Sequence, residues 1–327
     1  MQLYNREKDC YNNPICDREG RTVDFLYFLE KLRMPGLNEL MLAITTLGEE
    51  TAFLVIALIL FWCVDKRRGY YVLSVGFLGT LANQFMKLWF RIPRPWVLDE
   101  NFTILEQARE AASGYSFPSG HTQTAVGVFG ALAVTQKRRA LRILFVVLAV
   151  LVGFSRMYIG VHTPADVLMA AGTSVLFILI LHPVVMKRNG LPVLLGVLTV
   201  LSLGFLAFVE LYPFPADVDV HNLESGVKNA YTLLGSLIGL IAVYIVDTKW
   251  LDFSVKAVWW AQILKVLGGL VLVLAVKEGL RSPLDALCAG HMIARAVRYC
   301  LIVVTAGILW PLSFRFFSKL GIRKEEI

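Results

Sequence analysis

Residues 142–186 read RILFVVLAVLVGFSRMYIGVHTPADVLMAAGTSVLFILILHPVVM, two long apolar runs joined by a short polar link. Each run has about the 20 residues that a helix needs to cross a bilayer. Lipid offers no partner for backbone polar groups, so segments of this kind span as helices. The stretch therefore predicts a hairpin of two transmembrane helices. Charged side chains near its link, Arg156, His162 and Asp166, are costly there unless they serve a polar ligand.

The rest of the chain repeats this pattern. Of the 327 residues, 57% are hydrophobic and 17% are charged, whereas an ordinary soluble domain has about 25% charged residues. Residues 23–34 have apolar positions at helical spacing but are too short to span, which predicts a helix lying in the membrane interface. We predict an all-α fold, a polytopic transmembrane helical bundle of about nine spans. The expected spans are 40–64, 69–90, 119–136, 142–161, 164–186, 191–211, 229–247, 258–278 and 290–312.

Basic residues gather in short loops between the apolar runs and in the C-terminal tail. The loops include Lys66-Arg67-Arg68, Lys137-Arg138-Arg139 and Lys187-Arg188. By the positive-inside rule these loops and the C-terminus are cytoplasmic. With nine crossings, the N-terminus and loops 91–118 and 162–164 lie on the extracytoplasmic side. Topology thus accounts for the net charge of +7, and no basic patch interleaved with aromatics suggests nucleic-acid binding.

The N-terminal segment gives two further expectations. Its first ~20 residues are polar and show no cleavable signal peptide, and the C-terminal tail has no obvious retrieval signal. We therefore expect a multi-pass protein of a bacterial cytoplasmic membrane. Cys10 and Cys16 lie in the external segment, and the sequence leaves open whether they form a disulfide or remain two free thiols.

The segment Pro118-Ser119-Gly120-His121 opens a predicted span and is suited to hold an anion. Ser119 can cap the helix, and Gly120 lets a ligand approach the backbone. The free N–H groups of a helix N-terminus attract negative charge, and His121 would lie beside the anion. Taken alone, the segment is equally well a capped span start with an interfacial histidine.

His162 and Asp166 are four residues apart, about one helical turn, and Pro164 between them suits the first turn of a helix. Asp166 would accept a hydrogen bond from one imidazole nitrogen and leave the other free as a nucleophile. Such a pair is by itself a common structural feature. Arg156 favours the functional interpretation, because a planar guanidinium matches the geometry of phosphate.

Lys87 and Arg94 add two cations at the end of the 69–90 span. Cations that snorkel at span ends are ordinary, and we interpret Arg91 in that way. Arg94 differs, because Pro93 and Pro95 hold it in a stiff extended stretch. Three cations, two imidazoles and a carboxylate on one membrane face indicate a site for phosphoryl transfer without a metal or other cofactor.

The order of these motifs resembles the type 2 phosphatidic acid phosphatase (PAP2) superfamily. The pattern K-x6-R-P, P-S-G-H and S-R-x5-H-x3-D is present without substitution, its parts beginning at Lys87, Pro118 and Ser155. The nine-span layout is also loosely similar to the glucose-6-phosphatase branch. We divide the chain into an external N-terminal segment with the interfacial helix (1–36), a PAP2-like catalytic core (37–186) and additional C-terminal transmembrane helices (187–327).

The resemblance implies a role for each motif residue. His162 would be the nucleophile that forms a phosphohistidine, Asp166 would orient it, and His121 would protonate the leaving group and later assist the attacking water. The remaining residues would hold the phosphoryl oxygens: Lys87, Arg94, Ser119, Gly120 and Arg156.

We therefore expect an integral membrane hydrolase of phosphoric monoesters or pyrophosphates, metal-independent and with membrane lipids as its partners. Its substrate would be a lipid phosphate at the external face, such as phosphatidic acid, phosphatidylglycerophosphate or polyprenyl pyrophosphate. A phosphatase of a soluble ester such as a sugar phosphate, and a lipid phosphotransferase, are the enzymatic alternatives. A phospholipid headgroup transporter is the non-enzymatic one, and it leaves the two histidines and the carboxylate unexplained.

A second group of charges lies late in the chain, at Lys277, Arg281, His291, Arg295 and Arg298. It is a decayed copy of the first two motifs, a second anion-binding site or, more simply, a set of charges on the protein-buried face of the last helix. Arginines in an apolar run need partners. The acidic candidates are Glu210, Glu278 and Asp285.

One acidic loop could suggest a metal site, but its spacing matches no known ligand set, and we interpret it as a solvated external loop. Its residues are Asp217, Asp219, His221 and Glu224.

Overall fold

The computed structural model describes residues 24–320 apart from 111, 113 and 217, and every regular element in this part of the chain is a helix. The predicted all-α fold is thereby confirmed for the described residues. By their contacts the residues form two compact units, Met1–Glu50 with Met86–Val175 and Thr51–Phe85 with Leu176–Ile327. The predicted division of the chain at residues 36 and 186 is based on the positions of the motifs and not on contacts, and it stays a prediction.

The count of nine spans is not confirmed. Six helices of the described chain are long and apolar enough to cross a membrane, or seven if Pro35–Thr46 and Glu50–Val64 form one broken span. The two predicted spans without a counterpart are nevertheless helices, α5 (Lys66–Phe90) and α7 (Gly120–Thr135). Polar residues such as Asn83 and Gln84 lower the hydropathy of α5, and α7 has only 16 residues. The six candidates are Arg139–Tyr158, Pro164–Met186, Gly190–Leu211, Val220–Leu251, Trp259–Leu287 and Ile293–Phe317.

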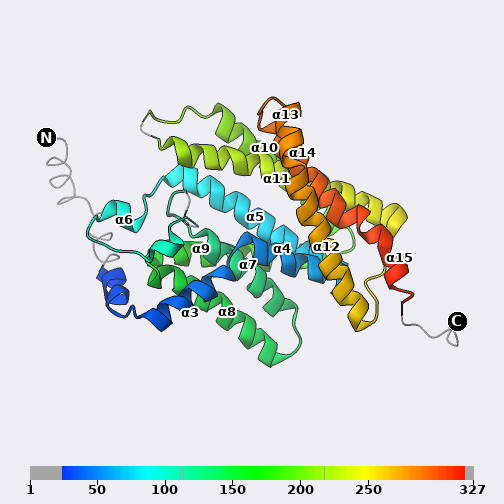
Figure 1. Cartoon of the computed structure of the whole chain (residues 1–327), viewed down its shortest axis with the longest axis horizontal. Coiled ribbons are helices and arrows are strands. Elements are labelled where there is room, and N and C mark those ends of the chain that lie inside the picture. Colours follow the sequence, from blue (N-terminus) through cyan, green and yellow to red (C-terminus); the bar gives the residue numbers. More distant parts are fainter. Residues whose placement is uncertain (1–23, 111, 113, 217, 321–327) are drawn as a thin grey trace. The chain divides into compact units, whose positions relative to one another are not determined.

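In the first unit, α8 (Arg139–Tyr158) packs against α7 and α3 (Pro35–Thr46), as Figure 1 shows. Residues 24–31 form a helix, as predicted for 23–34. Its buried Leu26 packs with Phe102 and Ile104, and its Tyr27 hydroxyl donates to the Asp99 carboxylate at 2.8 Å. This helix is therefore anchored on the loop that follows α6 (Pro95–Leu98). Cys10 and Cys16 lie outside the described residues.

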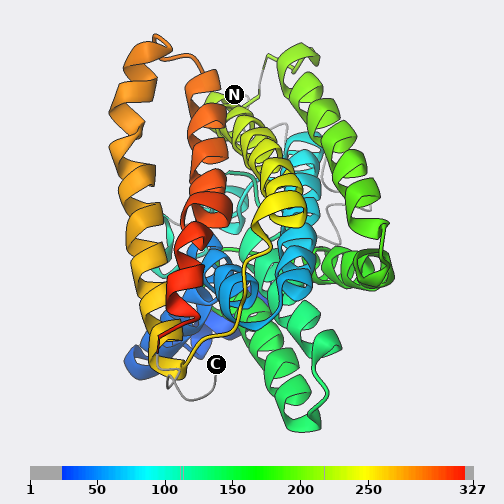
Figure 2. The same cartoon turned by 90° about the vertical axis from the view of Figure 1, so that its right-hand side faces the viewer.

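The second unit is a bundle in which α11 (Val220–Val246) packs against α10 (Gly190–Leu211) and α14 (Ile293–Val304). In Figure 2, α12 (Trp259–Gly279) and α14 run side by side. The remaining helices of this unit are α4 (Glu50–Ile59), the part of α5 up to Phe85, the second half of α9 (Pro164–Met186), α13 (Arg281–Leu287) and α15 (Phe314–Phe317).

Glycine sets the distance between α11 and α14. A Cβ atom added at Gly235 would lie 2.0 Å from the Ala296 carbonyl oxygen, and one at Gly239 would lie 2.8 Å from that of Cys300. Only a residue without a side chain fits so close to a neighbouring backbone, and small residues of this kind let membrane helices approach.

We expect Gly235→Ala to destabilise the protein by about 1–3 kcal/mol, because the added methyl group forces α11 and α14 apart. Thermal unfolding of the purified protein in detergent measures this. Gly204→Ala is the matched control, because Gly204 is also inside a long helix but a Cβ there meets nothing within 4 Å. Equal midpoints for the two variants would contradict the close packing of α11 and α14.

Candidate active site

All eight predicted site residues belong to the first unit, where three stretches of chain meet at the ends of helices. Lys87 lies in the last turn of α5, Ser119 caps α7, and Arg156 lies in the last turn of α8. Gly120 and His121 are the first two residues of α7, and Asp166 lies in the first turn of α9. Six of these side chains are buried: Lys87, Arg94, Ser119, Arg156, His162 and Asp166.

The imidazole of His162 is bound on both sides. Its Nε2 lies 2.9 Å from Nη1 of Arg94, and its Nδ1 lies 3.3 Å from Oδ2 of Asp166. A guanidinium has only donors, so Nε2 must accept with its lone pair and the ring proton must be on Nδ1. Asp166 accepts that proton's hydrogen bond. The surroundings thus select the tautomer in which Nε2 is the basic nitrogen.

The carboxylate of Asp166 is itself held by two further donors. Its Oδ2 accepts from the Ser116 hydroxyl at 2.6 Å and from the Thr163 backbone N–H at 2.8 Å. The Asp166 carbonyl also accepts from the Ser119 backbone N–H at 3.1 Å. This last bond ties the start of α7 to the start of α9, so the second and third sequence motifs form one assembly.

The two cations of the first motif are positioned by backbone carbonyls. Arg94 donates through Nε to Gly114 at 3.0 Å and through Nη1 to Val161 at 2.9 Å. Lys87 donates to the Tyr115 carbonyl. Carbonyl oxygens orient a cation without neutralising its charge.

Arg156 has a single hydrogen-bond partner in the described residues, the Thr45 hydroxyl at 2.8 Å from Nη1. Its Nε and Nη2 and the Nε2 of His121 are buried and have no hydrogen-bond partner in the protein. Buried polar groups are nearly always satisfied, so exceptions at a site call for a ligand. Guanidinium nitrogens and an imidazole next to a capped helix N-terminus suit a phosphate group.

The electrostatic surroundings keep His162 neutral. Burial lowers the pKa of His162 well below its ordinary value, and the positive charges of Arg94, Arg156 and Lys87 lower it further. A neutral imidazole at pH 7 keeps on Nε2 the lone pair that a nucleophile needs, and in this structure that lone pair accepts from Arg94.

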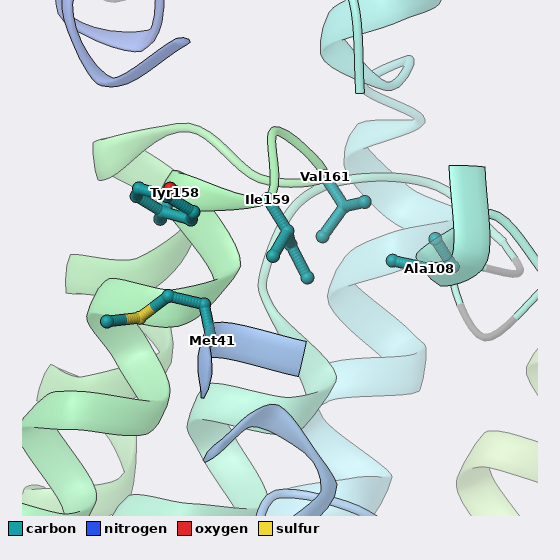
Figure 3. Close-up of a cluster of buried hydrophobic side chains, with 6 residues drawn as sticks. Met41, Ala108, Tyr158, Ile159 and Val161 are labelled. Atoms are coloured by element: carbon teal, nitrogen blue, oxygen red, sulfur yellow. The ribbon is translucent and has the colours of Figure 1, made fainter. Parts of the chain in front are cut away.

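A buried apolar cluster supports the turn that presents His162. Figure 3 shows Ile159 and Val161, both completely buried, packed with Met41 of α3 and Ala108 of the turn Glu106–Ala108. Between them, Gly160 has φ +88, a conformation that favours glycine. The backbone that delivers His162 is therefore fixed on both sides by packing.

Sequence reasoning missed two hydroxyl residues of the site. Thr45 precedes the break between α3 and α4, and Ser116 lies two residues before the Pro118 motif. Ser116 could have been noticed as a hydroxyl in a motif loop. Thr45 is 111 positions from the arginine it binds, and no local pattern connects the two.

The donor set favours an anion over a metal. Among the described residues, no three His, Cys, Asp or Glu side chains are placed to hold a metal ion. The groups that do converge are cations, hydroxyls and imidazoles, which bind phosphate oxygens directly.

Comparison with known proteins finds matches to two protein families. Residues 67–190 match the PAP2 superfamily, and residues 231–324 match the family described as PAP2 superfamily phosphatase, transmembrane extension. The phosphatidylglycerophosphatase B of Bacillus subtilis is 33% identical over 150 residues, which are 42% of this chain and 70% of that protein. An undecaprenyl-diphosphatase of the same organism is 32% identical over 118 residues, 36% of this chain and 58% of that protein.

Among solved structures, a transmembrane PAP2 type phosphatidylglycerolphosphate phosphatase from Bacillus subtilis is 28% identical, with a TM-score of 0.44, covering 53% of this chain and 89% of its own. The family matches and the 33% identity over most of a curated relative lead to one conclusion. This chain belongs to the PAP2 superfamily.

Proposed function

We propose that the chain is an integral membrane phosphatase that hydrolyses a lipid phosphate or pyrophosphate through a phosphohistidine at His162. The observation that carries the proposal is the pair of hydrogen bonds on the imidazole, which leaves Nε2 as its basic nitrogen. The relatives support the substrate class, since they are named as phosphatases of phosphatidylglycerophosphate and undecaprenyl diphosphate. Both names describe lipids, which favours a lipid substrate over a sugar phosphate.

In the first half of the reaction, Nη1 of Arg94 transfers its hydrogen bond from Nε2 of His162 to a phosphoryl oxygen. Nε2 then attacks phosphorus, and the bond to the leaving oxygen breaks. The imidazole gains positive charge as the new bond forms, and the carboxylate of Asp166 beside Nδ1 stabilises it. The leaving alkoxide or phosphate takes a proton from His121. A bound phosphate group favours the protonated form of His121, because an opposite charge nearby favours the charged state.

In the second half, His121 accepts a proton from a water molecule whose oxygen attacks the phosphohistidine. The phosphorus–nitrogen bond breaks, inorganic phosphate leaves, and His162 returns to its neutral state. The cations Lys87, Arg94 and Arg156 stabilise the charge on the equatorial oxygens in both steps. Preorganised donors of this kind contribute about 10²–10³ each to the rate.

The basic residues that flank α8 and α9 support an extracytoplasmic location for the site. The basic residues Lys137-Arg138-Arg139 precede α8 and Lys187-Arg188 follow α9. If both basic ends are cytoplasmic, the turn between the two helices is extracytoplasmic. A phosphate site there lies at the depth of lipid headgroups in the outer leaflet. The C-terminus is then cytoplasmic.

We expect His162→Ala to abolish release of inorganic phosphate from phosphatidic acid, phosphatidylglycerophosphate and a polyprenyl diphosphate, because no other group replaces the nucleophile. The assay uses purified protein in EDTA, where the wild type is expected to remain active since its cations replace a metal. His221→Ala is the control, because His221 is an exposed histidine on α11. Full activity of His162→Ala would overturn the mechanism, and loss of wild-type activity in EDTA would show a metal requirement.

We expect Thr45→Val to lower kcat/KM by about 10-fold, because Arg156 loses a hydrogen bond worth about 1.5 kcal/mol and is oriented less well. The neighbouring Thr46→Val is the matched control, since among the described residues the Thr46 hydroxyl bonds only to the Ala43 carbonyl of its own helix. Steady-state kinetics on a lipid phosphate, with thermal unfolding as a check on folding, measures both variants. Equal kinetics would mean that Thr45 does not position Arg156.

Cysteine labelling tests the orientation. In a variant whose own cysteines are replaced by serine, Asn101→Cys is expected to react with a membrane-impermeant maleimide in intact cells. Lys187→Cys is expected to react only after permeabilisation. Both positions are exposed, so the reverse pattern would place the site on the cytoplasmic side.

A further inference from the structure

Two arginines near the start of α14 lie on the protein-facing side of a candidate membrane span. Arg298 is 9% exposed and Ala294, one turn earlier, is 2% exposed. Aliphatic residues cover the opposite side, with Ile293 at 50% and Val297 at 39% exposure. The two charges are therefore directed into the second unit and not toward lipid, where a simple snorkelling arginine would lie.

No carboxylate neutralises these arginines in the described part of the chain. Glu278 pairs with Lys277 at 3.9 Å, and Glu210 bonds to the Tyr231 hydroxyl. Asp285 is exposed, and no ion pair joins it to either arginine. The acidic partners expected from the sequence are therefore not found for these arginines in the described residues, although Arg298 does lie on the buried face of the helix.

The hydrogen bonds of the two guanidinium groups are also incomplete. Arg295 donates from Nε to the Thr232 hydroxyl at 2.6 Å, and that hydroxyl donates its own proton to the Lys228 carbonyl at 2.8 Å. This bond orients Arg295 and leaves its terminal nitrogens to other partners. The Nε of Arg298 is buried without a hydrogen-bond partner.

Two like charges three residues apart on one helix repel each other, and an arginine without a counter-ion is costly inside a membrane protein. A bound anion removes both costs. Two planar forks of N–H donors suit a phosphate group, which accepts several charge-assisted hydrogen bonds at once. Van der Waals packing of α11 against α14 at Gly235 fixes the positions of both arginines.

The depth of the arginines indicates the source of the phosphate. Arg298 is five residues after Ile293, about 8 Å along the helix at about 1.5 Å per residue. Side chains on a helix tilt toward its N-terminus, so both guanidinium groups point toward the end of the span. Each headgroup layer of a bilayer is about 5–7 Å thick. If α14 begins at the membrane surface, the donors reach the level of lipid headgroups.

We propose that Arg295 and Arg298 of α14, with the Thr232 hydroxyl of α11, form a second phosphate-binding site that holds the headgroup phosphate of an anionic membrane lipid. The site uses none of the residues of the catalytic mechanism and does not depend on it. Its ligand is held and not hydrolysed, because the Thr232 hydroxyl donates its proton to the Lys228 carbonyl and no described contact pairs it with a base.

Retention of lipid by the purified full-length protein, read by native mass spectrometry, tests the proposal. The probes are phosphatidylglycerol and phosphatidylcholine with the same acyl chains. Phosphatidylglycerol is a phosphodiester and offers the catalytic site no terminal phosphate. We expect the wild type to prefer phosphatidylglycerol and the R295Q/R298Q variant to lose that preference by about 10-fold, since charge-assisted hydrogen bonds are lost.

The matched control is K277Q/R281Q, which removes the same charge from the neighbouring α12 and α13 and is expected to keep the preference. An unchanged preference in R295Q/R298Q, an equal loss in the control, or no preference in the wild type would overturn the proposal. If the double variant gives no monodisperse protein, Arg298→Gln alone is expected to lower the preference, and no change there contradicts the proposal equally.

Inorganic phosphate in excess distinguishes the two sources of the ligand. If it leaves the retention of phosphatidylglycerol unchanged, the site is specific for the lipid, as we expect. If it displaces the lipid from the wild type but not from R295Q/R298Q, the phosphate site stands but its ligand is free phosphate, and the assignment to a lipid is wrong.

Discussion

The imidazole of His162 is held between a guanidinium at Nε2 and a carboxylate at Nδ1, and the remainder of the site is arranged around that bridge. Arg94 can donate but not accept, so its contact decides which ring nitrogen has the lone pair. Asp166 can accept from Nδ1 only while Ser116 and the Thr163 backbone keep the carboxylate in place. The apolar packing of Ile159 and Val161 then holds the turn from which His162 extends.

The site contains three like charges, and several groups of the first unit are needed to hold them in position. Lys87, Arg94 and Arg156 are buried together, and like charges in a region of low dielectric repel strongly. Carbonyl oxygens and one hydroxyl accept hydrogen bonds from the three cations and offset part of this cost. A hydroxyl likewise accepts from Arg295, at Thr232.

Much of the site could be anticipated from the sequence, because each catalytic candidate lies in a short motif whose spacing has a physical meaning. The four-residue separation of His162 and Asp166 predicts one helical turn, and the structure has them in contact. Ser119 as the cap of α7 follows from its place before an apolar run. Thr45 could not be found in this way, since its contact with Arg156 arises only when α3 packs on α8.

The number of spans was harder to predict, because length and apolar content were the only guides. Residues 69–90 and 119–136 form helices, but α5 has polar and basic residues along it and α7 is short. Helices that pack inside a bundle need less apolar surface than helices in lipid, so a sequence pattern cannot separate the two. The acidic partners expected for Arg295 and Arg298 are not found in the described residues. Side-chain pairing between distant helices depends on how the helices pack, which a sequence pattern does not show.

In the proposed mechanism, Nε2 of His162 is the nucleophile because Arg94 and Asp166 fix the ring. The most direct measurement is to quench the enzyme during turnover of a ³²P-labelled lipid phosphate and locate the label by mass spectrometry under alkaline conditions. We expect phosphate on Nε2 of residue 162. Phosphate on Nδ1 of that ring, on another residue, or on no residue despite rapid turnover would contradict it.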